Sequence, residues 1–165
     1  MEKIVIIMGS ASDEEKVKPA IKLLKEEFGI NTGVYCISAH RAHDGLMQFI
    51  KKMNDSGRTS VVIAAAGLSA ALPGVIAALT TIPVIGLPLS GSTLGGQEAL
   101  ISMVEMPPGV PVAAVGIDNA KNAALMAARI VANELPEVGM TLLRYNEAQS
   151  KKSMTTNDEI HNRYA

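Results

Sequence analysis

Five short runs of apolar residues recur along the chain, and none of them alternates with polar residues. They cover residues 4–8, 33–37, 60–65, 84–87 and 112–117. A continuous apolar run bounded by turn residues predicts a strand that is buried on both faces, as in a parallel sheet covered by helices. Parallel strands need crossover connections, so we expect the segments between the runs to be helical.

The connecting segments do have helical spacing. Apolar residues fall on one helical face over residues 17–28 and 46–53. Pro19 conflicts with an uninterrupted first helix, so we expect an irregular turn there. The connectors over residues 70–80 and 95–104 are apolar almost all round, which predicts burial on more than one side and therefore an oligomer.

A fifth helix and a polar tail follow the last apolar run. Residues 119–135 have a helical pattern with Asp118 or Asn119 as the cap. After Pro136 the pattern weakens, and we expect another helix over residues 137–151 that then frays.

These elements predict a single domain over residues 1–165, with a βα core over 1–135 and a C-terminal helical tail over 136–165. Five βα units with right-handed crossovers give an α/β fold, a three-layer doubly wound parallel sheet. The flavodoxin-like strand order 2-1-3-4-5 is the economical choice. Ligands of such sheets bind beyond the carboxyl ends of the strands, so the loops at that edge are the candidate site.

Charge and composition exclude several classes of partner. Fifteen basic against sixteen acidic residues give a net charge of −1, so no global field favours nucleic acid or an anionic membrane surface. Aromatic residues make up 3% and Trp is absent, which removes the platforms that stack single-stranded bases. An anionic ligand must therefore meet a local site.

The cysteine content and the first residues indicate the compartment. Cys36 is the single cysteine and lies in an apolar run, so we expect a buried core thiol and no intrachain disulfide. The apolar opening over residues 4–8 is too short for a signal peptide or a membrane span. We therefore expect a cytoplasmic protein.

A short polar loop follows the first apolar run. Gly9, Ser10, Ser12 and Asp13 come directly before a helix, where backbone N–H groups and the helix dipole favour a phosphate. Asp13 would repel a phosphate, so ribose hydroxyls are its expected partners. The alternative is a serine or aspartate helix cap with a glycine turn. The dinucleotide and P-loop glycine patterns are absent.

The loop after the second run contains Ser38, His40 and Arg41. The guanidinium fork of Arg41 can hold a phosphate, and histidine, the residue type at position 40, is the side chain most often used in acid and base catalysis. His40 could instead belong to an ordinary surface loop. His43 lies nearby, but two histidines without a third ligand make a weak case for a metal.

The third and fourth loops are small and poor in charge. Residues 66–74 could let backbone amides approach a flat heterocycle, or could serve tight packing of a helix on the sheet. Residues 88–96 could cover the same edge.

Four ordered motifs together resemble one family. They are MGSASD, SAHR, AAAGLSAALPG and VEMPPGVPVAAVGIDNAKNAALMAARI, in a region from about Lys3 to Leu135. The family is that of N5-carboxyaminoimidazole ribonucleotide mutase, also called the catalytic subunit of phosphoribosylaminoimidazole carboxylase. The resemblance implies an isomerase of purine biosynthesis that moves a carboxyl group from the exocyclic nitrogen to carbon 4 of an aminoimidazole ribonucleotide. It also implies no ATP, metal or organic cofactor, and a homo-octamer.

Roles carried over from the resemblance fall on residues of the same loops. His40 would be the general acid and base, and Asp13 would bind ribose hydroxyls. The phosphate would be held by Ser10 and Arg41, supported by Ser12 and Ser38. The heterocycle pocket would be lined by Gly67, Ala70 and Leu72.

The chain departs from the family pattern at two places. The mutase branch usually has a histidine in AAHLPG, where this chain has Ala71, and SAHRTP, where this chain has Ala42 and His43 after Arg41. The branch that carboxylates the ribonucleotide directly with carbon dioxide resembles SAHK and AGRSN. Arg41 and Leu68 disfavour that branch, whereas Ser69 and the missing histidine favour it.

Two other classes of function stay open. One is a catalytically silent nucleotide-binding homologue in which the phosphate site survives, although the retained His40 argues against it. The other is a flavodoxin-type mononucleotide binder, which the shortage of aromatic residues disfavours.

Overall fold

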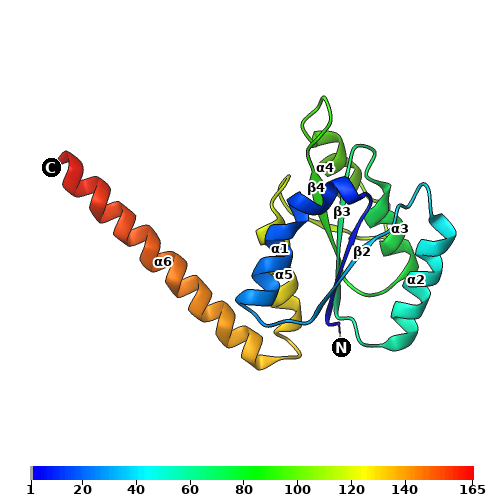
Figure 1. Cartoon of the computed structure of the whole chain (residues 1–165), viewed down its shortest axis with the longest axis horizontal. Coiled ribbons are helices and arrows are strands. Elements are labelled where there is room, and N and C mark those ends of the chain that lie inside the picture. The colour runs from blue at the N-terminus through cyan, green and yellow to red at the C-terminus, as the bar shows by residue number, and fades with distance from the viewer. Residues whose placement is uncertain (1) are drawn as a thin grey trace.

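The computed structural model describes residues 2–165 and has a five-stranded sheet at its centre (Figure 1). The strands are β1 (Ile4–Met8), β2 (Thr32–Cys36), β3 (Val61–Gly67), β4 (Val84–Leu89) and β5 (Ala113–Ala114). Their order is β2-β1-β3-β4-β5, and every neighbouring pair is parallel. The predicted flavodoxin-like sheet is therefore confirmed.

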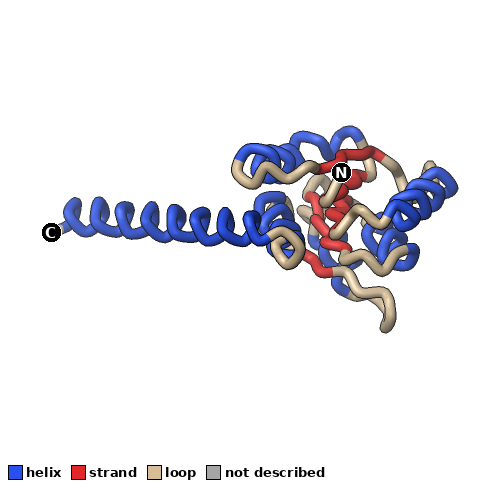
Figure 2. The backbone as a smooth tube through the Cα atoms, turned by 90° about the horizontal axis from the view of Figure 1, so that it is seen from below, coloured by secondary structure: helices blue, strands red, loops and turns tan. Residues whose placement is uncertain are grey.

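Helices cover both faces of the sheet, as the view from below shows (Figure 2). One face is covered by α1 (Glu14–Glu26) and α5 (Ala120–Val131). The other is covered by α2 (His43–Ser56), α3 (Ala71–Leu79) and α4 (Gln97–Val104). The result is the predicted three-layer arrangement.

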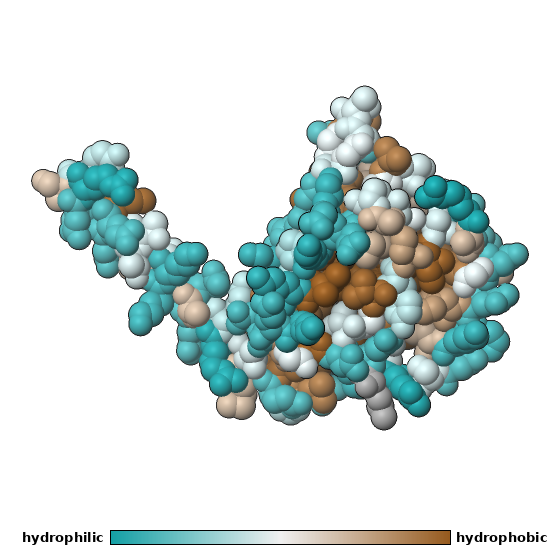
Figure 3. Space-filling view, viewed as in Figure 1, coloured by the Kyte–Doolittle hydropathy of each residue, from teal (hydrophilic) through white to brown (hydrophobic). Residues whose placement is uncertain are grey.

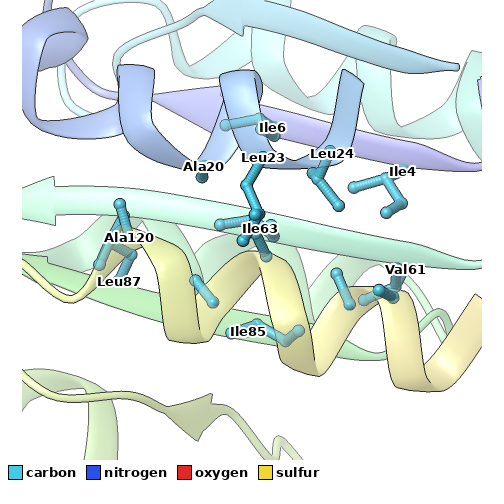
Figure 4. Packing of buried hydrophobic residues seen from close by; sticks show 14 of the residues in the cluster. Ile4, Ile6, Ala20, Leu23, Leu24, Val61, Ile63, Ile85, Leu87 and Ala120 are labelled. Carbon is cyan, nitrogen blue, oxygen red and sulfur yellow. The ribbon is translucent and has the colours of Figure 1, made fainter. Parts of the chain in front are cut away.

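The three central strands explain why the apolar runs show no alternation. In β1, Ile4 and Ile6 face α1 and α5, whereas Val5 and Ile7 face the opposite layer. Figure 4 shows Ile4 and Ile6 packed with Ile63 of β3 between the two helices. Each fully buried isoleucine contributes about 1.5–3 kcal/mol of hydrophobic stabilisation, so the two faces together hold the layers in place.

The edge strands depart from the prediction. Strand β2 begins one residue earlier than expected, and its side chains are only partly covered. Cys36 is exposed, so the prediction of a buried thiol was wrong. The reason is that β2 has a neighbouring strand on one side only. Strand β5 is two residues long, although Val115 N–H still donates to the carbonyl of Gly86 in β4 at 3.0 Å.

The first helix runs without interruption through Pro19. An irregular turn is present, but it lies earlier, as the 3₁₀ turn η1 (Ala11–Asp13) directly before α1. Pro19 is exposed, so the carbonyl that its missing N–H would have satisfied can bind water. The predicted position of the irregularity was therefore wrong.

The C-terminal helix α6 (Pro136–Tyr164) leaves the body of the molecule (Figure 1). Val138 and Leu142 anchor its first turns in the core, and Tyr145 packs near Phe28 with ring centroids 6.1 Å apart. The rest is largely hydrophilic on the visible face (Figure 3). The helical tail is confirmed, but the predicted fraying after residue 151 is not observed.

Two further expectations concern single features. The cap of α5 is Asn119, whose side chain accepts a hydrogen bond from the Asn122 N–H at 3.2 Å. Within residues 2–165, no helix combines the length and the apolar character needed to cross a membrane.

Candidate functional site

A cavity of about 670 Å³ opens at the carboxyl ends of β1, β2, β3 and β4. All nine predicted site residues line it: Ser10, Ser12, Asp13, Ser38, His40, Arg41, Gly67, Ala70 and Leu72. The strand register explains the convergence, because Met8 lies opposite both Cys36 and Ala65, and Gly67 lies opposite Leu89. Four loops from distant parts of the sequence therefore begin at the same edge of the sheet, those after β3 and β4 about two residues beyond those after β1 and β2.

The loop after β1 forms a capping box. The Ser12 N–H donates to Ser10 Oγ at 3.3 Å, and the Ser10 N–H donates to Asp13 Oδ2 at 3.0 Å. The Ser12 hydroxyl also donates to Ser10 Oγ at 2.8 Å. These bonds hold both hydroxyls at the start of η1 and α1, where the helix dipole favours an anion.

Asp13 is partly buried beneath this loop. Burial raises the pKa of its carboxyl group, while the Ser10 N–H and the nearby Lys16 ammonium oppose that rise. A carboxylate in this position is costly to desolvate and gains from accepting hydrogen bonds. Ribose hydroxyls are donors of the right kind.

The loop after β2 is a tight turn that begins at Ser38. Its carbonyl accepts from the Ala42 N–H at 2.9 Å, and its hydroxyl oxygen accepts from the Arg41 N–H at 3.3 Å. The side chains of His40 and Arg41 are exposed at the cavity. Arg41 makes no ion pair with any carboxylate in the described part of the chain, so its guanidinium can meet an incoming anion.

The loop after β3 supplies a wall made of backbone and small side chains. A Cβ at Gly67 would lie 3.0 Å from the carbonyl oxygen of Leu89, so glycine permits this close approach of β3 and β4. Leu68 has a φ of +54°, an uncommon conformation for a bulky residue and a common one at binding sites. Ala70 and Leu72 are buried and border the cavity beneath it.

The sequence matches a known family over most of its length. The model of the AIRC family, described as AIR carboxylase, covers residues 3–152. The chain belongs to this family. The predicted resemblance is thereby confirmed.

Relatives in the family carry related enzyme names. The N5-carboxyaminoimidazole ribonucleotide mutase of Pyrococcus abyssi is 48% identical over 147 residues, which cover 89% of this chain and 83% of that protein. The phosphoribosylaminoimidazole carboxylase of Schizosaccharomyces pombe is 46% identical over 133 residues, or 81% of this chain and 24% of that protein.

A solved structure has the same fold. The chain is 29% identical in sequence to Treponema denticola PurE, and its structure superposes on the crystal structure of that protein with a TM-score of 0.86. The match covers 94% of this chain and 96% of that one. The flavodoxin-like core and the C-terminal helix therefore have a counterpart of nearly equal length.

Sequence reasoning missed one group of residues at the cavity of this family member. Lys16 and Ser90 line it, and both contact Asp118. Lys16 comes three residues after Asp13, a spacing that puts both on one side of α1 and could have indicated it. Asp118 was considered only as a helix cap.

No metal site accompanies these residues. His43 begins α2, and no group of three or more His, Cys, Asp or Glu side chains suited to a metal occurs within residues 2–165.

Proposed function

We propose that this chain is an N5-carboxyaminoimidazole ribonucleotide mutase of purine biosynthesis. It would convert that substrate to 4-carboxy-5-aminoimidazole ribonucleotide without ATP, metal or organic cofactor. Membership of the AIR carboxylase family and the names of relatives that match over most of their length support the assignment. The observation that carries it is the convergence of His40, Arg41 and the capped serine loop on one cavity.

The substrate phosphate would bind at the end of the cavity where α1 begins. Ser10 and Ser12 offer hydroxyls there, and Ser38 and Arg41 face it from the loop after β2. A fixed cation and a helix N-terminus together favour a dianion. Asp13 would accept hydrogen bonds from the ribose.

The aminoimidazole ring would lie along the wall built by the loop after β3. Gly67 lines this wall, and Ala70 and Leu72 provide an apolar border. Confinement there would keep released carbon dioxide close to carbon 4, which replaces activation by ATP with proximity.

His40 would move the protons of both steps. In the first step the bond between the exocyclic nitrogen and the carboxyl carbon breaks, carbon dioxide leaves, and His40 gives a proton to the nitrogen. In the second step carbon 4 attacks carbon dioxide, and His40 removes the proton from carbon 4. The imidazole returns to its starting state, so one residue can serve as general acid and then as general base.

The test is to incubate the purified protein with each candidate ribonucleotide and follow the product by NMR. Conversion of the N-carboxylated ribonucleotide without ATP supports the mutase. Activity only with the uncarboxylated ribonucleotide and carbon dioxide would assign the direct carboxylase, which Ser69 and the absence of a histidine at Ala71 favour. Binding without turnover would identify a silent homologue.

The same proposal includes self-assembly and a cytoplasmic location. The resemblance points to a homo-octamer, and neither nucleic acid nor membrane is an expected partner. Large apolar side chains on the outer layer support assembly, because Leu94, Ile101 and Val104 around α4 are more than half exposed in the single chain.

A further inference from the structure

Polar groups from three elements meet at one side of the cavity. Lys16 lies in the first turn of α1, Ser90 follows β4, and Asp118 follows β5. Lys16 Nζ donates to the Ser90 carbonyl at 2.7 Å and to the Ser90 hydroxyl, and it lies 3.4 Å from Asp118 Oδ1. The Asp118 carboxylate accepts from the Ser90 N–H at 3.0 Å and from the Ser90 hydroxyl. We call these three residues the Lys16 cluster.

The Lys16 cluster borders the region assigned to ribose. Lys16, in the first turn of α1, follows Asp13, the last residue of η1, by three positions, and both line the cavity, whereas Asp118 does not. The Lys16 charge opposes the burial that raises the pKa of Asp13. Lys16 therefore lies between the Asp13 carboxylate, which lines the cavity, and the Asp118 carboxylate, with which it pairs outside the cavity lining.

Ser90 is also the first residue of the connection between β4 and α4. This connection, residues 90–96, projects beyond the carboxyl edge of the sheet (Figure 1). Gly91, Gly95 and Gly96 all have positive φ, at 126°, 64° and 92°, so the segment is built from residues with the greatest backbone freedom. An anchor at its first residue decides where the segment begins relative to the cavity.

Asp118 is itself held in place. Its φ is +55°, and its N–H donates to the carbonyl of Pro88 in β4 at 2.9 Å. The carboxylate is thus fixed against the end of β4, and Lys16 connects this fixed point to α1. The anchor spans two walls of the cavity, formed by the start of α1 and the end of β4.

We propose that Lys16 is a positioning residue for the substrate site. Its ammonium group, held by Ser90 and Asp118, fixes residues 90–96 against α1 and sets the width of the cavity at its ribose and phosphate end. The identity of the substrate rests on the function proposed above. The competing assignment makes Lys16 a direct ligand of the substrate phosphate.

Substitution of Asp118 distinguishes the two roles of Lys16, because the positioning role predicts a higher KM and the phosphate-binding role does not. If Lys16 positions the loop, Asp118→Asn weakens the anchor and raises KM for the N-carboxylated ribonucleotide. If Lys16 instead binds the phosphate, the loss of a competing carboxylate leaves KM unchanged or lowers it. The amide keeps an oxygen for the Ser90 N–H, so the change removes charge with little loss of shape.

The experiment compares Lys16→Met, Lys16→Arg, Asp118→Asn and the control Lys18→Met, each checked for folding by circular dichroism. Lys18 lies on the same helix and pairs with Glu15 outside the cavity. We expect Lys16→Met and Asp118→Asn to raise KM by about three- to tenfold with kcat within about twofold, because the anchor is a partly exposed ion pair. Lys16→Arg should recover part of the loss, and Lys18→Met should match the wild type.

Hydrogen exchange of the ligand-free protein supplies a readout that needs no substrate. Amides of residues 91–96 should exchange faster in Lys16→Met and Asp118→Asn than in Lys18→Met. Unchanged exchange, or a KM for Asp118→Asn at or below that of the wild type, would overturn the proposal. If the wild-type protein fails to convert the substrate, the proposed function falls, while exchange still decides the role of Lys16. If Lys16→Met does not fold, both KM and the exchange of residues 91–96 are measured on Asp118→Asn.

Discussion

His40 stands at the cavity mouth with an exposed ring, beside a cation that can hold the substrate. We predict that His40→Asn abolishes turnover and leaves ribonucleotide binding within about tenfold, because an amide keeps polarity but cannot shuttle a proton. Steady-state kinetics and calorimetric binding to the product ribonucleotide measure the two effects. Near-normal turnover would contradict the acid and base role.

Asp13 combines a proposed binding role with a cost to stability. Its pKa is raised in the folded state, chiefly by burial, so ionisation at neutral pH disfavours folding. We predict that Asp13→Asn raises Tm at neutral pH while weakening nucleotide binding, since the amide oxygen can still accept from the Ser10 N–H. The gain in Tm should shrink as the pH falls toward about 3, because the wild-type carboxyl is then protonated in both states.

Substitution of Asp118 should change Tm in the opposite direction and therefore serves as a matched control for Asp13→Asn. Burial acts to raise its pKa, but hydrogen bonds from Ser90 and the charge of Lys16 outweigh burial and lower it. Asp118→Asn should therefore lower Tm at neutral pH, and the loss should disappear as the pH falls through the folded-state pKa. Equal pH profiles for the two variants would contradict both assignments.

Ala71 places a methyl group where the mutase pattern that this sequence resembles implies a histidine. It begins α3 and lines the cavity. We predict that Ala71→His increases mutase turnover more than it changes KM, because the ring could orient the migrating carboxylate. The measurement is kcat on the N-carboxylated ribonucleotide. No gain in a variant that folds and binds would show that His40 and the backbone suffice.

At the scale of elements, the central strands were predictable and the edge strands were not. The limits of β1 were predicted without error, because burial on both faces leaves an uninterrupted apolar pattern. Strand β2 has a similar pattern, yet Cys36 is exposed there. The predicted strand order already placed this strand at the edge, but its apolar residues alone do not show how little of an edge strand the neighbouring elements cover.

The candidate site likewise contains residues that could be predicted from the sequence and contacts that could not. The nine predicted residues lie at or shortly after strand ends, so the rule for parallel sheets places their loops at one edge, whereas the choice of Gly67, Ala70 and Leu72 came from the family resemblance. The contact of Lys16 with Ser90 joins residues 74 positions apart, and Ser90 meets Asp118 across 28. Contacts of this kind depend on how the start of α1 meets the loops after β4 and β5, and they leave no local pattern.

Two glycines in different elements should respond oppositely to alanine. Gly67→Ala places a Cβ 3.0 Å from a backbone oxygen of β4, and we predict a loss of about 1–2 kcal/mol as the strands move apart. Gly45 lies exposed inside α2 with open space around it, so Gly45→Ala should gain about 0.5–1 kcal/mol. Urea denaturation compares the two, and a stabilised Gly67→Ala would show that β3 and β4 are less tightly fitted.

At the scale of the molecule, the exposed apolar surface predicts association. Large apolar side chains are exposed around the cavity, on α4 and along α6, and they include Leu68, Leu94, Ile101, Val104, Met140 and Leu143. We predict an oligomer, with an octamer as the expected form, because such a surface is unusual for a monomer. Light scattering on the purified protein at micromolar concentration measures the mass. A monomeric mass would contradict the prediction.

The strand order also determines which parts of the chain must be in place before the cavity is complete. No two strands pair through a local hairpin, and β1 must wait for β3 before it is flanked on both sides. The loops that carry Ser10 and His40 are synthesised first, yet the wall at Ser90 arrives some eighty residues after Ser10 in the sequence. The cavity therefore requires contacts between distant parts of the chain, so ligand binding can serve as an assay that the βα core through β4, and not merely its first half, has reached its native arrangement.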